Sequence, residues 1–270
     1  NFLKLINEKD KLSEMIETIN ILRNFSINLR IYTSEYGGLI SANIVAPVGV
    51  YFKKGNKNIN RLLPFRLKGQ EGYVPRDMLE TYENAIQQMN IILPEIIPDL
   101  SLSLVQKDTR INQKGEEEVQ LDFLSNRGSK KFSLVYESDG IKKIIGLVAY
   151  LIEVYNNPSV IAVIDELDSG VYEYLLGELI SVMSTGAKGQ LVFTSHNLRI
   201  LEVLETNKVV VSTSNPQNRY IKLKNVKETN NLRDLYLRTI QLGGQKEELY
   251  QGKSSADLRI AFMKAGKAIE

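Results

Sequence analysis

The spacing of hydrophobic positions changes near residue 138, and this change divides the chain into two kinds of region. In the first, helical spacing of apolar residues predicts one helix over 11–25 and a longer one over 75–97, broken near Pro94. Polar and apolar residues alternate elsewhere in it, and this pattern predicts strands in "NLRIYTS", "ANIVAPVGVYF", "LSLSLV", "EEVQLDFLS" and "KFSLVYES". We expect the last three strands to be antiparallel neighbours.

From residue 138 onward, predicted helices alternate with short apolar strands. "SDGIKKIIGLVAYLIEVY" predicts a helix capped by Ser138 or Asp139, and "VIAVID" predicts a strand buried on both faces of a parallel sheet. A helix in "VYEYLLGELISVMS", a second buried strand in "GQLVFTS", a short helix in "NLRILEVL" and two strands in "KVVVST" and "YIKLK" follow. The tail, 227–270, is charged and helical in pattern, with a break at Gly243 and Gly244. This alternation indicates an α/β fold with a mostly parallel sheet flanked by helices.

Composition excludes several classes of protein. The 270 residues, 43% hydrophobic and 24% charged, fit one large or two small globular domains. A net charge of +2 is too small to indicate nucleic acid or an acidic membrane surface by itself. The chain has no cysteine, so disulfides and thiolate metal sites are excluded, and we expect a cytoplasmic location. No apolar stretch is long enough to span a membrane.

Two adjacent carboxylates follow the strand in "VIAVID". Asp165 and Glu166 lie at its carboxyl end, where ligands bind in open α/β sheets. In phosphate chemistry, Asp165 would hold Mg²⁺ directly or through water, and Glu166 would orient and deprotonate the attacking water. The same dipeptide also fits a solvated turn with an acid that caps the next helix.

Two further groups could contact phosphate. The next buried strand ends in "VFTSHN", which places His196 at the same edge of the sheet, where an imidazole can hydrogen-bond a γ-phosphate. Ser138 and Gly140 begin a helix, and its free N–H groups and dipole attract anions. Lys142 and Lys143 oppose that dipole, so we expect a negative partner near them. An incidental histidine and an ordinary capped helix are the alternatives.

The order and spacing of these motifs resemble the C-terminal half of ABC-type ATPase heads. "ESDGIKK" resembles a divergent signature motif, "VIAVIDE" a Walker B strand, "LDSG" a D-loop and "TSHN" a switch histidine. Together with "NLRDLYLRTIQLGGQKEELY", they are most similar to the RecF/SMC/OLD-like "AAA family ATPases" of prokaryotes. Many of those sit in phage-defence or abortive-infection systems. The resemblance covers roughly 130–250 and, less closely, the helix at 76–97.

The resemblance implies a fold and a division of the chain. The expected fold is the C-terminal lobe of a P-loop NTPase, with an antiparallel β/helical insertion beside its parallel sheet. Residues 1–75 would form a helical and β insertion or lid, 76–226 the C-terminal lobe, and 227–270 a helical tail.

The resemblance also implies a mechanism, because such heads dimerise with ATP between them. It assigns Asp165 to Mg²⁺, Glu166 to the attacking water and His196 to the γ-phosphate. The residues that it places at the nucleotide across the dimer interface are Ser138, Asp139, Gly140 and Asp168. Asp139 departs from the usual pattern, in which glycine is common, and a carboxylate close to a γ-phosphate is repulsive.

A Walker A loop, G-x-x-x-x-G-K-[ST], should precede these motifs by a strand. Gly252-Lys253-Ser254 has Glu247 in place of the first glycine, and the charged run "QKEELYQ" leads into it. Gly128-Ser129-Lys130 also lacks the first glycine. We therefore expect the Walker A strand and loop upstream of residue 1, and no ATP turnover by residues 1–270 alone.

The leading functional hypothesis is an ATP-binding and ATP-hydrolysing switch. Its heads would dimerise, or form a higher homo-oligomer, and control an effector nuclease or toxin in anti-phage defence or abortive infection. The alternatives are a DNA-repair or chromosome-maintenance ATPase and an ATP-dependent scaffold with little turnover. Nothing indicates a membrane partner, which disfavours a transporter ATPase. The basic, acid-free stretch 53–68 is a candidate contact for DNA or an acidic partner, and it also fits a solvated loop.

Overall fold

The chain forms two compact units, Asn1–Asn197 and Leu198–Glu270. The computed structural model describes residues 2–33, 45–54, 57–66, 73–224, 231–250 and 252–267, with side chains for 12–33, 73–224, 231–250 and 252–266. The expected divisions after residues 75 and 226 stay predictions. None of the described helices combines the length and apolar character of a membrane span.

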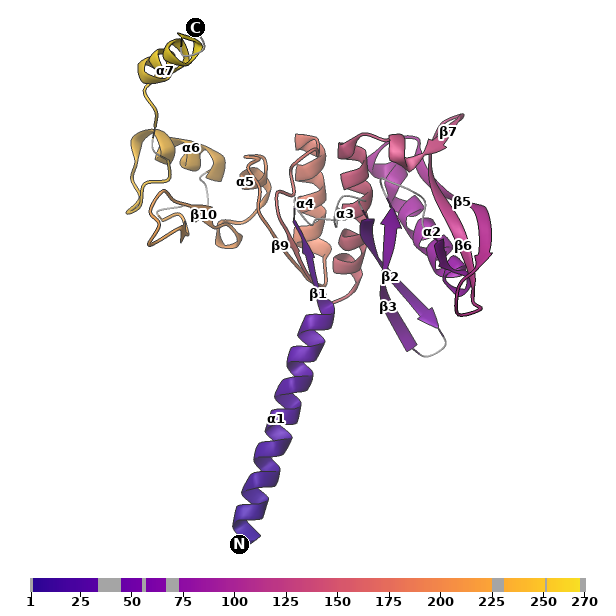
Figure 1. Cartoon of the computed structure of the whole chain (residues 1–270). Helices are drawn as coiled ribbons and strands as arrows, with labels where there is room; N and C mark the ends of the chain where they lie inside the picture. Colours follow the sequence, from indigo (N-terminus) through magenta and orange to yellow (C-terminus); the bar gives the residue numbers. More distant parts are fainter. Residues whose placement is uncertain are drawn as a thin grey trace. The chain divides into compact units, whose positions relative to one another are not determined.

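A three-stranded parallel sheet organises the first unit (Figure 1). Its strands, in spatial order, are β1 (Leu29–Tyr32), β8 (Ile161–Ile164) and β9 (Gln190–Phe193), and both pairings are parallel. The predicted α/β class with a parallel sheet is confirmed. β1 belongs to this sheet even though it comes from the part of the chain that we expected to form an insertion.

The described helices cover one face of the parallel sheet and not the other. α3 (Asp139–Asn156) packs on the face that carries Tyr32, and α4 (Glu173–Gly186) packs beside α3. On the opposite face, Ile31, Val163 and Val192 are in register across the three strands, and Ile31 and Val192 are 59% and 54% exposed. The prediction that "GQLVFTS" forms a fully buried strand is therefore wrong. β9 is an edge strand in the described part of the chain, and no described helix covers that face.

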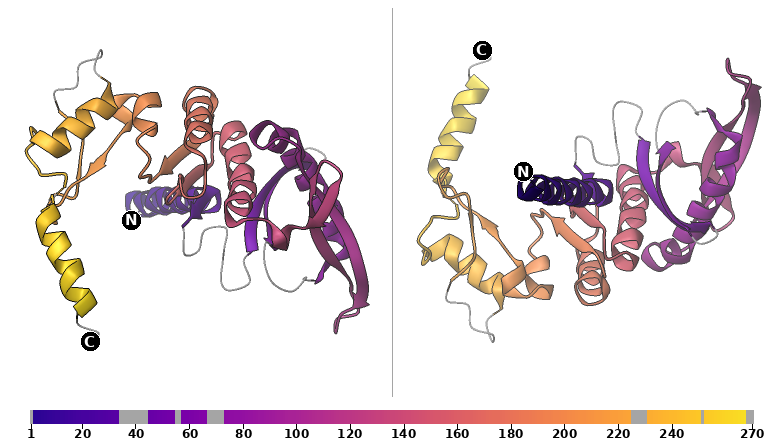
Figure 2. Two further views of the ribbon diagram at one scale, coloured as in Figure 1. Left: turned by 90° about the horizontal axis from the view of Figure 1, so that it is seen from above. Right: turned by 90° about the horizontal axis from the view of Figure 1, so that it is seen from below.

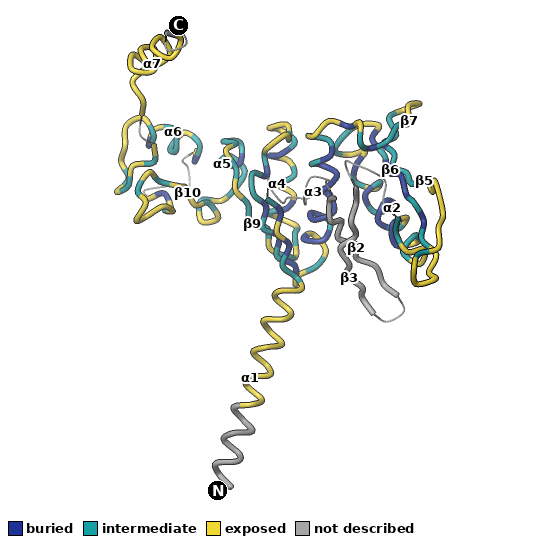
Figure 3. Tube along the Cα trace, in the orientation of Figure 1, coloured by how far each residue is buried: buried dark blue, intermediate teal, exposed yellow. Residues whose placement is uncertain are grey.

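The N-terminal helix and most of the antiparallel strands form where the sequence pattern predicts them, but the strand predicted in "KFSLVYES" ends at Ser133 and gives way to a 3₁₀ turn. α1 (Phe2–Asn28) leads directly into β1, and its described side chains are almost all exposed (Figure 3). A second sheet is antiparallel throughout, with β5 on one side of β6 and both β4 and β7 on the other. Its strands are β4 (Tyr73–Pro75), β5 (Leu100–Ile111), β6 (Glu117–Arg127) and β7 (Lys130–Ser133). β2 (Val45–Lys54) and β3 (Lys57–Arg66) form an antiparallel hairpin, and the side chains of the basic stretch 53–68 lie outside the described residues.

A second helix joins the antiparallel sheet to α3. After a 3₁₀ turn, η1 (Arg76–Met78), α2 (Leu79–Ile96) lies between this sheet and α3 (Figures 1 and 2). Its buried face includes Tyr82, Met89 and Leu93. The break predicted near Pro94 is not at that residue: α2 continues through Pro94 and ends at Ile96, where the Ile97 N–H donates to the Leu93 carbonyl. A second 3₁₀ turn, η2 (Leu134–Tyr136), leads from β7 to α3.

The second unit has its own small core of Val211, Leu223 and Leu232. Its elements are α5 (Ile200–Val203), η3 (Thr206–Lys208), β10 (Val211–Ser212), β11 (Tyr220–Ile221), α6 (Leu232–Leu242) and α7 (Ser255–Lys267). β10 and β11 pair with each other as an antiparallel ladder. Within the predicted tail, the described helices are α6, which ends at Leu242 with Gly243 as its C-cap at a φ of 75°, and α7.

A buried ion pair ties β1 to α3. The Arg30 guanidinium donates two hydrogen bonds to the Glu153 carboxylate, at 2.9 Å and 2.8 Å, and the two side chains are only 5% and 1% exposed. Two residues further, on the same face of the strand, Tyr32 packs edge-on against Tyr150, and burial raises the pKa of Tyr32 to about 12. These contacts fix a strand from the start of the chain against a helix that begins more than a hundred residues later.

We predict that Arg30→Met lowers the free energy of unfolding by about 3–5 kcal/mol, because it leaves the Glu153 carboxylate buried without its partner. Urea denaturation followed by circular dichroism measures the loss. Arg76→Met is the matched control: Arg76 pairs with Glu117 where both side chains are about half exposed, at 49% and 42%, and such pairs contribute about 0–1 kcal/mol. Equal losses in the two variants would contradict a special role for the buried pair.

Candidate functional site

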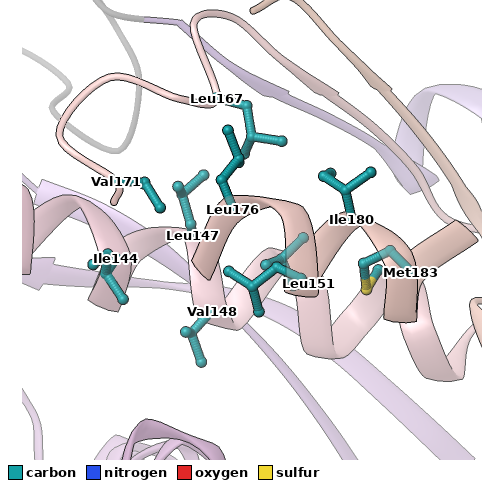
Figure 4. A pocket seen from close by; sticks show the side chains of 10 residues that line it. Ile144, Leu147, Val148, Leu151, Leu167, Val171, Leu176, Ile180 and Met183 are labelled. Carbon is teal, nitrogen blue, oxygen red and sulfur yellow. The ribbon is translucent and has the colours of Figure 1, made fainter. Parts of the chain in front are cut away.

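The loop after β8 is anchored by one buried leucine. Leu167 is 3% exposed and points into the apolar contact between α3 and α4, among Leu147, Leu151, Leu176 and Ile180 (Figure 4). Glu166 precedes it and Asp168 follows it, and both stay partly exposed. The burial of Leu167 therefore holds the acidic residues at the carboxyl end of the sheet.

A threonine at the end of β9 holds the two adjacent acids. The Thr194 hydroxyl donates to Asp165 Oδ1 and accepts the N–H of Glu166 at 2.8 Å. The backbone N–H of Leu167 donates to the Thr194 carbonyl at 3.0 Å, and that of Asp165 donates to the Tyr32 carbonyl at 2.7 Å. Glu166 has a φ of 48°, in the left-handed region that non-glycine residues seldom adopt. The acidic loop is thus hydrogen-bonded to the ends of both neighbouring strands.

The start of α3 is fixed by a cap and a buried carboxylate. Ser138 is the N-cap residue, and its hydroxyl accepts the N–H of Ile141 at 3.3 Å, which decides between the two caps left open by the sequence. The preceding residue, Glu137, is buried and accepts hydrogen bonds from Ser125 and Arg127 of β6. Ser138 itself is exposed to solvent. The residue before it, Glu137, is fixed by its hydrogen bonds to the antiparallel sheet.

Two glycines bring the start of α3 against the loop after β8. A Cβ atom on Gly140 would lie 2.9 Å from the carbonyl oxygen of Gly170, which is closer than real Cβ contacts. Gly170 has a φ of 75°, a conformation that also favours glycine. Ser138, Asp139 and Gly140 therefore lie beside the segment that contains Asp168.

Lys143 lies among the acidic residues. Its ammonium group donates to the Glu166 carbonyl at 2.6 Å. Burial lowers the pKa of Lys143, while the carboxylates of Asp168, Glu166 and Asp165 act in the opposite direction. The negative partners that we expected near this helix start are, for Lys143, the carboxylates of the acidic loop. For Lys142, the Asp139 carboxylate lies 3.8 Å from the ammonium group.

His196 lies at the same edge of the sheet. Its backbone N–H faces both carboxylate oxygens of Asp168 at 3.3 Å, and the residue is exposed. Two contacts thus connect the predicted site residues. Gly140 packs against Gly170, two positions after Asp168, and the His196 backbone N–H faces the Asp168 carboxylate. The assignment of catalytic, nucleotide and metal roles to these residues stays a prediction.

Sequence patterns did not assign a role to two residues of this cluster, Thr194 and Lys143. Thr194 stands inside the "FTSHN" motif, and a hydroxyl at the first position after an apolar strand was the available signal. The sequence shows that Lys143 opposes the helix dipole, but it does not show that its ammonium group donates to the Glu166 carbonyl. The Gly128-Ser129-Lys130 segment lies at the turn between β6 and β7, and Gly252-Lys253-Ser254 precedes α7 without a strand before it.

Asp165 would be the one protein carboxylate to bind Mg²⁺ at this site. Among the described residues, no three Asp, Glu or His side chains are grouped as metal ligands. Oδ1 of Asp165 accepts the Thr194 hydroxyl. Mg²⁺ commonly takes one or two protein carboxylates and completes its shell with water and phosphate oxygens, so Asp165 fits this arrangement.

We predict that Gly140→Ala lowers the free energy of unfolding by about 1–3 kcal/mol, because its Cβ would collide with the backbone of Gly170. Helix propensity alone would favour alanine by about 1 kcal/mol, so the sign of the change is informative. Gly266→Ala in α7 is the control, since nothing lies within 4 Å of its added Cβ. Denaturant titration measures both, and a stabilised Gly140→Ala variant would refute the close contact.

Comparison with solved structures gives two similar SMC proteins. One is the Smc head domain with a coiled coil and joint from Pyrococcus yayanosii, with 13% identity, a TM-score of 0.43, and coverage of 60% of this chain and 30% of that one. The other is described under "Structural biochemistry of ATP-driven dimerization and DNA stimulated activation of SMC ATPases". It has 14% identity and a TM-score of 0.44, and the match covers 63% of this chain and 98% of that one. No curated protein matches the sequence.

One protein family matches more than half of the chain. Residues 55–202 match the family described as "AAA domain, putative AbiEii toxin, Type IV TA system". The matched range contains α2, α3, β8, α4 and β9, together with every residue of the predicted site. The chain therefore belongs to this AAA domain family.

Proposed function

We propose that the protein carrying this chain is an ATP-driven switch, an ATPase whose heads dimerise around ATP. The observation that carries the proposal is the contact between the start of α3 and the acidic loop after β8. It joins two segments that resemble the signature and Walker B motifs. Membership of an AAA domain family supports the choice of ATP as the ligand.

In this proposal, each residue at the carboxyl end of the sheet has a separate role. A bound Mg²⁺ ion would neutralise charge on the phosphate oxygens, and Asp165 would be its protein ligand. Glu166 would orient the attacking water and accept its proton. His196, exposed at the end of β9, would donate a hydrogen bond to the γ-phosphate.

The start of α3 would contact the nucleotide of a second subunit. Ser138 and Asp139 are exposed, and the free N–H groups of a helix start attract phosphate. The nearby ammonium group of Lys142 would reduce the repulsion between the Asp139 carboxylate and a γ-phosphate. Gly140 would allow close approach, and Asp168 would lie at the seam between the subunits.

The phosphate-binding loop is proposed to come from a segment outside residues 1–270. β9 has one unpaired edge among the described strands. A parallel strand added there would end beside Thr194 and His196, so its loop would lie next to Asp165. This position would complete the site that the acidic residues begin.

The proposed output is control of an effector nuclease or toxin in anti-phage defence or abortive infection. The family description names a putative toxin of a Type IV TA system, which favours this output over others. Two alternatives follow from the sequence motifs alone, because each would use the same ATPase head. One is DNA repair or chromosome maintenance, and the other is a scaffold that assembles with ATP and hydrolyses little of it. All three would act in the cytoplasm.

We predict that Glu166→Gln lowers the kcat of the full-length protein for ATP hydrolysis by at least about a hundredfold, because the amide cannot accept a proton. Phosphate release measures kcat, and light scattering with and without ATP measures dimerisation, which the variant should retain. Glu178→Gln, at an exposed position of α4, is the matched control and should leave kcat unchanged.

Three results would change the proposal. ATP turnover by residues 1–270 alone, abolished by Glu166→Gln, would overturn the external phosphate loop. ATP-dependent dimers without turnover would favour the scaffold. Hydrolysis that rises on addition of double-stranded DNA would favour repair or chromosome maintenance over control of an effector.

A further inference from the structure

The backbone of Glu166 is held by side chains from two other elements. Its N–H donates to the Thr194 hydroxyl at 2.8 Å, and its carbonyl accepts the Lys143 ammonium group at 2.6 Å. The N–H of Ser169 donates to the same carbonyl at 3.0 Å. Among the described residues, Glu166 and Asp99 are the two non-glycine residues with positive φ.

This conformation needs external support. For a residue with a Cβ atom, left-handed φ is sterically unfavourable, and it persists where the surrounding structure fixes it. Rotation of φ back to an ordinary value would change the direction of the Cα–Cβ bond. Because Leu167 is buried, such a rotation would need compensating changes in the neighbouring peptide groups, and the Glu166 carboxylate would then point elsewhere.

We propose that Lys143 and Thr194 are positioning residues that hold Glu166 in its left-handed conformation and so aim its carboxylate at the reacting water. This inference rests on the proposed ATPase function. The two side chains contact the backbone of Glu166, so they act through it. Thr194 also donates to Asp165, so the same hydroxyl would orient both Glu166, the proposed base, and Asp165, the proposed metal ligand. Lys143 couples the base to α3, whose first residues would face the second subunit.

The test uses the full-length protein and two pairs of variants. Thr194→Val and Lys143→Met remove the hydrogen bonds, while Thr194→Ser and Lys143→Arg keep a donor at each position. We expect the first pair to lower kcat for ATP hydrolysis by about tenfold to a hundredfold, because small misplacements of a catalytic group have effects of this size. KM for ATP and ATP-dependent dimerisation should change little, and the second pair should recover most of the lost kcat.

The second unit offers matched controls. Thr213 makes the same double contact, since its hydroxyl donates to the Asn218 carbonyl and accepts the N–H of Asn215. Lys222 likewise donates to a backbone carbonyl, that of Asn207. Thr213→Val and Lys222→Met remove comparable bonds that do not involve Glu166, and they should leave kcat near the wild-type value.

The outcomes separate this inference from the proposed function. An inactive wild-type protein would overturn the ATPase proposal and the inference with it. An active wild-type protein whose Thr194→Val and Lys143→Met variants keep full kcat would overturn the positioning role alone. A raised KM with unchanged kcat would show that the two residues serve nucleotide binding instead. Should Thr194→Val fail to fold, Lys143→Met and Lys143→Arg carry the test.

Discussion

The site depends on the burial of one apolar side chain, that of Leu167. Because Leu167 enters the contact between α3 and α4, the chain cannot continue β8 in an extended course, and it turns at Glu166. Asp165, Glu166 and Asp168 consequently project from a fixed loop at the end of the sheet. The hydrophobic packing of two helices thus determines where three carboxylates lie, and the hydrogen bonds of Thr194 and Lys143 refine their arrangement.

Electrostatics and close packing then join this loop to α3. The carboxylates of Asp165, Glu166 and Asp168 all act on the half-buried Lys143, whose positive charge offsets part of the repulsion among them. Burial disfavours the charged form of a lysine and lowers the pKa of Lys143, and the surrounding carboxylates oppose that shift. The contact between Gly140 and Gly170 excludes side chains from the gap. The helix start and the acidic loop therefore form one connected surface, which sequence spacing alone does not reveal.

Local sequence patterns predicted where helices and strands form better than they predicted how deeply those elements are buried or what they contact. Apolar spacing identified α3, α4 and α6 and the strands that carry Asp165 and His196, because amphipathic periodicity reflects which face is buried. The pairing of β1 with β8 depends on contacts across more than a hundred residues, notably between Arg30 and Glu153, and no local pattern encodes them. β9 was expected to be buried because its residues are apolar, but burial requires a covering neighbour. The contacts of Thr194 and Lys143 with the Glu166 backbone likewise depend on tertiary structure.

The arrangement also bears on how a switch of this kind would be controlled. In the proposed function, the contacts of Thr194, Lys143 and Ser169 with the Glu166 backbone would orient the base within one subunit. In the same proposal, the exposed groups at the start of α3 and the edge of β9 that is unpaired among the described strands would be completed by a second subunit and a phosphate-binding loop. If the proposed function holds, regulation would act on assembly, by bringing a phosphate-binding loop and a second α3 to a prearranged base. A catalytic group fixed in advance lowers the reorganisation needed at the moment of reaction, which makes assembly the natural point of control.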